Sequence, residues 1–187
     1  SLEDLVRTIR EEIERLMKEA EDTNRRNKEE SEESLRRLKK LVEDIDREVK
    51  EVLDRAEKNT RTDEVREKVR RMIESLRRDI EEIRKRIEEA VKKSEDVVRK
   101  SLEEVRRAVK RLRDLVDKIL ELVEKGLPEK VVEELIRRIK DELKKIRERN
   151  KELSDRDKKL NEDVEREVRK LIDEIRKKLE DVERTVK

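Results

Sequence analysis

The sequence of 187 residues contains no phenylalanine, tyrosine, tryptophan, histidine, cysteine or glutamine, and it has one glycine and one proline. The absence of cysteine excludes disulfide bonds and thiol chemistry, and it leaves the redox compartment undetermined. The lack of both histidine and cysteine argues against the usual zinc and iron sites. One glycine cannot form a phosphate-binding loop. The commonest kinds of catalytic and cofactor-binding site are therefore not expected here.

Long hydrophobic runs and a charge of one sign are also missing. The sequence has no run of 18 apolar residues, so no membrane-spanning helix is predicted. No signal-peptide pattern is visible at the N-terminus, so the sequence does not indicate a localisation. Charged residues make up 59% of the chain, yet 56 basic residues face 54 acidic ones and the net charge is +2. The two signs are interleaved, which is typical of a solvated surface. We therefore expect neither nucleic acid nor a membrane as a partner.

Two short stretches carry strong helix-stop signals. In KNTRTDEV (58–65), Asn59 can end a helix and Thr62 can cap the next one. In EKGLPEKV (124–131), Gly126 suits the left-handed position after a helix, and Pro128 suits the first turn of a new helix. These stretches divide the chain into three predicted helices of about 60 residues. The predicted helices span residues 2–58, 63–125 and 128–186.

Apolar residues recur in all three segments at a mean spacing of about 3.6 residues, which keeps the apolar stripe on one side of a straight helix. Such regular spacing argues against disorder, despite the high charge. At a rise of about 1.5 Å per residue, each helix would be roughly 90 Å long. Short connections between helices of similar length predict antiparallel neighbours. We therefore expect an all-α fold: one domain, 1–187, forming a straight, single-chain, up-down-up three-helix bundle.

The apolar stripe is interrupted near the middle of each predicted helix by small polar residues. The stretch EDTNRRNKEESEES (21–34) has no apolar side chain, but the phase of the stripe continues through it. The predicted register places Ser94 opposite Asn27 and Ser101 beside Asn150 and Ser154. Asn and Ser side chains from three helices can then satisfy one another's hydrogen bonds. The predicted buried polar network consists of Thr23, Asn24, Asn27, Ser31, Ser34, Ser94, Ser101, Asn150, Ser154, Asp157 and Asn161.

Several alternatives remain open at this stage. The polar middle could be dry, partly hydrated or open, or it could form a ligand cavity. Asp157 could accept hydrogen bonds from Asn and Ser, or it could lean outward to a neighbouring Arg or Lys. Ser94 and Ser101 fit the network better than a nucleophilic role, because no base is paired with them in the sequence pattern. We expect no catalytic residue, no bound metal and no cofactor, so the chain is not expected to be an enzyme.

The equal helices, their matched period, the minimal connections and the restricted set of residue types together resemble the parametrically designed three-helix bundles that carry buried hydrogen-bond networks. The resemblance covers the whole chain. It implies a stable, thermostable, monomeric scaffold that requires no partner and has no evolved activity. The alternatives are a helix-association module, either a heterotrimer precursor or a helix-swapped homodimer, and a natural spectrin-like rod. The natural rod fits less well, because such repeats have shorter helices and usually aromatic cores.

Overall fold

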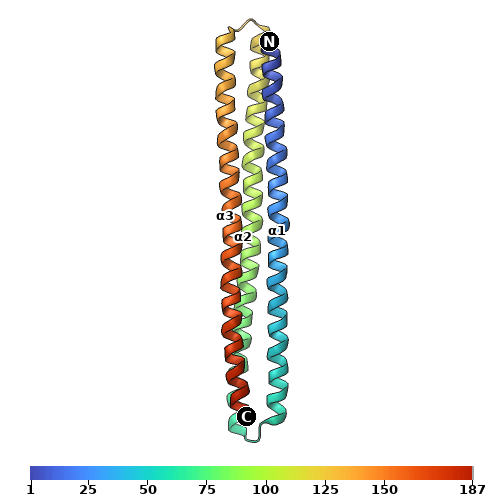
Figure 1. Ribbon diagram of the computed structural model, residues 1–187, viewed down its shortest axis with the longest axis vertical. Helices are drawn as coiled ribbons and strands as arrows, with labels where there is room; N and C mark the ends of the chain where they lie inside the picture. The colour runs from blue at the N-terminus through green and yellow to red at the C-terminus, as the bar shows by residue number, and fades with distance from the viewer. Residues whose placement is uncertain (187) are drawn as a thin grey trace. The chain divides into compact units, whose positions relative to one another are not determined.

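Three long helices account for nearly all of the chain in a computed structural model, which describes residues 1–186 (Figure 1). Helix α1 spans Leu2–Asn59, α2 spans Asp63–Glu124 and α3 spans Glu129–Val186, and no strand occurs among the described residues. Each helix boundary lies within one residue of its predicted position. The prediction of an all-α three-helix bundle is confirmed.

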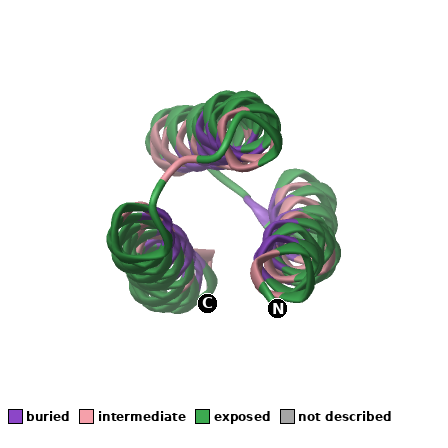
Figure 2. Ribbon diagram, turned by 90° about the horizontal axis from the view of Figure 1, so that it is seen from above, coloured by how far each residue is buried: buried purple, intermediate pink, exposed green. Residues whose placement is uncertain are grey.

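The contacts divide the bundle into two compact units, and each unit contains one section of every helix. Unit 1 consists of Ser1–Glu29 and Glu95–Lys158, and unit 2 consists of Glu30–Ser94 and the chain from Lys159 onward. In each unit the buried positions of the three helix sections face one another (Figure 2). Each unit therefore has an apolar core of its own, built on the repeating stripe of the sequence.

The core of unit 1 lies among the first half of α1, the second half of α2 and the first half of α3. Its most deeply buried side chains include Ile13 on α1, Val109 on α2 and Ile139 on α3, each 0% exposed. The N-terminus lies at the same end of this unit as the connection between α2 and α3 (Figure 1). Antiparallel packing of α2 and α3 follows from that short connection.

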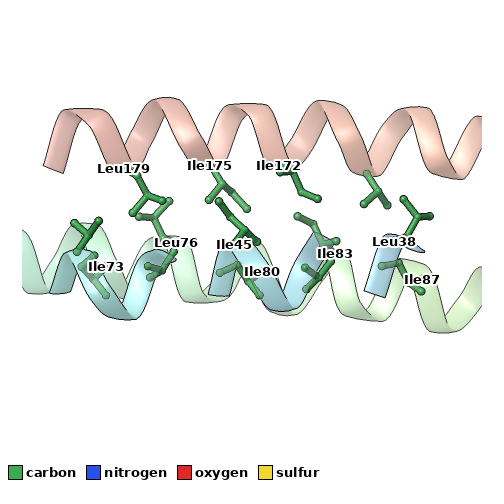
Figure 3. Packing of buried hydrophobic residues seen from close by; sticks show 14 of the residues in the cluster. Leu38, Ile45, Ile73, Leu76, Ile80, Ile83, Ile87, Ile172, Ile175 and Leu179 are labelled. Atoms are coloured by element: carbon green, nitrogen blue, oxygen red, sulfur yellow. The ribbon is translucent and has the colours of Figure 1, made fainter. Parts of the chain in front are cut away.

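The core of unit 2 consists of stacked isoleucine, leucine and valine side chains from all three helices (Figure 3). Ile45 on α1, Ile80 on α2 and Ile175 on α3 are each at most 1% exposed. Burial of such a side chain stabilises the fold by about 1.5–3 kcal/mol. The core thus forms from aliphatic residues alone, without the large area that aromatic rings would bury.

The connection between α1 and α2 is held by threonine side chains. The Val65 amide donates a hydrogen bond to Thr62 Oγ1 at 3.3 Å, which makes Thr62 the N-terminal cap of α2. Thr60 is 7% exposed, and its Oγ1 accepts a hydrogen bond from Arg66 Nε at 3.3 Å. Asn59 is the last residue of α1. The short turn is therefore fixed by local hydrogen bonds.

The connection between α2 and α3 depends on the only glycine of the sequence. Gly126 has a φ of 89°, which is the left-handed region. Its amide donates to the Val123 carbonyl at 3.1 Å, and the Leu127 amide donates to the Leu122 carbonyl at 3.0 Å. This pair of bonds is the Schellman arrangement that ends a helix at a left-handed residue. The Pro128 carbonyl accepts from the amides of the first turn of α3, which begins at Glu129.

Ion pairs connect neighbouring helices along the edges of both cores. In unit 1, Arg113 of α2 donates to both carboxylate oxygens of Glu14 on α1, at 2.6 and 2.7 Å. In unit 2, Lys178 of α3 contacts Asp79 of α2 at 2.7 Å. The Glu14–Arg113 pair is about half exposed on each side. Such exposed pairs contribute little stability, typically about 0.2–1 kcal/mol each.

Candidate buried polar sites

Polar residues occupy buried positions where the apolar stripe of each helix is interrupted. Ten of the eleven predicted network residues are buried: Asn24, Asn27, Ser31, Ser34, Ser94, Ser101, Asn150, Ser154, Asp157 and Asn161. Thr23 is only partly buried. The phase of the apolar stripe therefore identified the inward face of these polar stretches correctly, except at Thr23, which lies at its edge.

In unit 2, the hydroxyl of Ser31 joins all three helices. Ser31 Oγ on α1 accepts a hydrogen bond from Asn161 Nδ2 on α3. It also accepts one from Ser94 Oγ on α2, at 3.2 Å. Asn161 Oδ1 is buried and has no hydrogen-bond partner. One serine thus organises a polar contact among three helices, but it leaves one amide oxygen unsatisfied.

Ser34 reaches a partner that the sequence pattern did not indicate. Its hydroxyl donates to Glu165 Oε2 at 3.4 Å. The other carboxylate oxygen of Glu165 accepts hydrogen bonds from Arg169 Nε and Nη2, at 3.2 and 3.1 Å. The side chain of Glu165 is 29% exposed, so it lies at the edge of the core. In the sequence, only the place of Glu165 directly after the inward-facing Val164 indicated that its side chain could reach the core.

In unit 1, two separate hydrogen bonds join α3 to the other helices. Asn27 Nδ2 on α1 donates to Ser154 Oγ on α3. Ser101 Oγ on α2 donates to Asn150 Oδ1 on α3 at 2.8 Å. Asn24 Nδ2 is buried without a hydrogen-bond partner. The polar residues of this unit are therefore only partly satisfied by one another.

Asp157 is 1% exposed and takes part in a polar interaction. One of the two expectations for this residue was that it would lean outward to a surface Arg or Lys. Its burial shows that this alternative is wrong. An inward-facing carboxylate requires polar partners, because removing a charge from water without compensation is costly.

The register of α1 against α2 can be followed within unit 2, where Ser94 donates to Ser31. The predicted placement of Ser94 opposite Asn27 stays a prediction, because Asn27 belongs to unit 1. By contrast, Ser101 bonds to Asn150, one of the two α3 residues that the predicted register placed beside it.

The polar positions combine neutral hydrogen bonds with contacts to carboxylates. Ser94 donates to the Ser31 hydroxyl and Ser101 donates to the Asn150 amide oxygen, whereas Ser34 donates to the carboxylate of Glu165. Hydrogen bonding to Arg113 lowers the pKa of Glu14 below its ordinary value of 4.5. That pair lies on the surface, so the shift describes an ion pair rather than an acid or base in a cleft.

Over residues 1–186, no group of three or more acidic side chains is arranged to hold a metal ion. Within that same range, no helix has a stretch long and apolar enough to cross a membrane. Comparison of the chain with protein-family models, curated protein sequences and solved structures gave no match.

Proposed function

We propose that this chain is a designed structural scaffold without catalytic activity, in which the buried polar residues specify helix pairing and register. The restricted set of residue types and the three nearly equal helices support a designed origin. In this proposal the chain is a thermostable monomer that needs no cofactor and no partner. Its function is to hold one arrangement of three helices.

The observation that carries the proposal is the position of Ser31. Its hydroxyl accepts hydrogen bonds from Ser94 on α2 and from Asn161 on α3. An apolar core alone tolerates sliding of one helix by a turn, because leucine and isoleucine pack against many neighbours. A slide that separates these three residues would leave buried polar groups unpaired, at about 1–3 kcal/mol each. The polar contacts therefore disfavour shifted registers.

The proposal can be tested by removing the polar character of the four buried asparagines. In the variant, Asn24, Asn27, Asn150 and Asn161 are all replaced by leucine. We expect higher thermal stability, because buried apolar groups replace incompletely satisfied amides. We also expect several sets of amide signals in a nuclear magnetic resonance correlation spectrum, or a mixture of masses in light scattering, because register and partner choice are less restricted.

A matched control carries four substitutions that leave the core apolar: Ile13→Leu, Leu38→Ile, Ile83→Leu and Ile172→Leu. This control should keep one set of amide signals and one mass. A sharp loss of stability in the asparagine variant, with one mass and one set of signals, would show that the asparagines do not restrict register.

A second candidate function is helix association between chains. The connection of three residues between α1 and α2 supports it, because short hinges can favour exchange of a helix between two copies. Light scattering distinguishes the two candidates. The proposed monomer has a mass of 22.8 kDa, whereas a helix-swapped dimer has about twice that mass. Only the monomer fits a scaffold that is complete in one chain.

A further inference from the structure

A groove of about 370 Å³ lies between α2 and α3 in unit 1. Its polar end is formed by Ser101 and Asn150, which are hydrogen-bonded to each other at 2.8 Å. Its apolar lining comes from Val105 and Ala108 on α2 and from Ile146 and Leu153 on α3. The groove is therefore a surface feature with an apolar floor, and one end of it is formed by a hydrogen bond that joins α2 to α3.

Small side chains on α2 explain why the two helices leave this space. Serine, valine and alanine stand at positions 101, 105 and 108 along the edge of α2 that faces the groove. Ala108 is 8% exposed, so its methyl group lies at the bottom of the hollow. A larger side chain at position 108 would fill much of it. The hollow thus results from the sequence of one helix edge.

The charges around this groove are unequal, although those of the whole chain nearly balance. The lining includes the cations Arg107, Arg111, Lys145 and Arg149, but Glu104 is the only acidic residue in it. Glu104 forms an ion pair with Arg149, whose Nε lies 3.6 Å from Glu104 Oε2. Arg107 Nε donates to the backbone carbonyl of Glu103 rather than to a carboxylate. Lys145 Nζ lies 3.7 Å from Glu142 Oε1, so Lys145 and Arg149 are both paired with carboxylates. Arg107 and Arg111 are the lining cations that remain available to a bound anion.

Another groove of the bundle lacks this imbalance. In unit 2, a hollow of about 200 Å³ between α1 and α2 is lined by Lys39, Arg84, Glu43 and Glu88, together with Val42 and Ile87. Its two cations are matched by two carboxylates. Charge excess and apolar floor are thus combined in the groove of unit 1 but not in that of unit 2. The balanced groove serves as an internal control.

We propose that the groove of unit 1 binds a linear amphiphile with an anionic head, such as a fatty acid anion of about ten carbons. The alkyl chain would lie over Ala108 and Val105, where it leaves water. The carboxylate would be held by Arg107 and Arg111, and guanidinium groups suit planar carboxylates. An apolar groove with a few polar groups is the usual form of a small-molecule site.

The test is a titration of the full-length chain with decanoate below its micelle concentration, followed by amide chemical shifts. We expect saturable shifts confined to residues near 101–111 and 145–153. Ala108→Leu should weaken binding at least tenfold by filling the hollow. Val42→Leu, which fills the balanced groove of unit 2, should leave binding unchanged. Decyltrimethylammonium, with the same chain and a positive head, should not bind.

A second variant protects the test against an Ala108→Leu chain that fails to fold. Arg107→Glu combined with Arg111→Glu changes only the rim, and it should also weaken decanoate binding at least tenfold. Equal binding of decanoate and decyltrimethylammonium would overturn the proposal. So would shifts spread over both units, or unchanged affinity in the folded Ala108→Leu and rim variants.

Discussion

At the scale of single residues, Asn24 and Asn27 lie one turn apart on α1 but have different hydrogen-bonding environments. Both are 4% exposed. Asn27 donates its amide to Ser154, whereas the amide nitrogen of Asn24 has no partner. The same residue type can therefore stabilise or destabilise the bundle, depending on what another helix presents to it.

We expect Asn24→Leu to raise the free energy of unfolding by about 1–3 kcal/mol, because it removes an unsatisfied buried donor. Asn27→Leu should stabilise less, or destabilise, because it leaves the Ser154 hydroxyl without its donor. Denaturant unfolding of the two variants, followed by circular dichroism, measures the difference. Equal effects would show that the hydrogen bond from Asn27 contributes nothing specific.

The Glu14–Arg113 pair gives a pH dependence whose sign can be stated. Arg113 lowers the pKa of Glu14 in the folded chain, so the pair stabilises the fold above the ordinary pKa of 4.5. That contribution is lost as the pH falls through the lowered folded value. Both side chains are about half exposed, so we expect a coupling energy of only about 0.2–1 kcal/mol at pH 7.

A double-mutant cycle with Glu14→Gln, Arg113→Met and both changes together isolates this coupling. Thermal unfolding should give a measurable coupling at pH 7 and none at a pH where Glu14 is protonated. A coupling that persists in strong acid would mean that the two side chains interact by packing instead of charge.

At the scale of the elements, the end of α2 depends on the left-handed conformation of Gly126. A Cβ atom added at this position would meet no atom within 4 Å, so a substitution meets no steric barrier from neighbours. The cost of Gly126→Ala is therefore conformational, and we expect a loss of about 1–2 kcal/mol. Gly126→Asn should lose less, because asparagine enters this region more readily.

Urea unfolding of both Gly126 variants measures these losses. The loss for Gly126→Ala should exceed the loss for Gly126→Asn if residue 126 keeps its left-handed conformation in both variants. An alanine variant as stable as the parent would indicate that the connection between α2 and α3 can adopt another conformation without cost.

At the scale of the whole molecule, each of the three helices contributes a section to both compact units. We predict that the chain is one domain and unfolds in one step, because local opening of a unit must break all three helices internally. Ile13→Ala in unit 1 and Ile80→Ala in unit 2 should each lower the free energy of unfolding by about 2–5 kcal/mol.

Hydrogen exchange measured by mass spectrometry tests this prediction, since it reports on peptides from each unit separately. If the chain is a single domain, Ile13→Ala lowers the protection of core amides from exchange equally in units 1 and 2. Ile80→Ala should also lower that protection equally in both units. Loss of protection confined to the unit that carries the substitution would show two independently unfolding parts.

Local features of this fold could be predicted from the sequence because their causes are local. Thr62 and Gly126 act on backbone groups within a few residues of themselves, so residue type and order were sufficient to place them. The inward position of Asn24 and Asn27 also followed from the phase of the apolar stripe. The partner of Ser34 did not follow, because Glu165 lies on another helix at the edge of its core.

The number of helices, their ends and the buried face of each could be read from the order of residues, since propensity, capping and periodicity act along one chain. The packing of the helices, in contrast, determines that Ser94 contacts Ser31, that the Asn24 amide has no acceptor and that a groove remains beside Ala108. Such features depend on how far one helix is shifted against another. A shift of one turn preserves the apolar pattern and exchanges every polar partner.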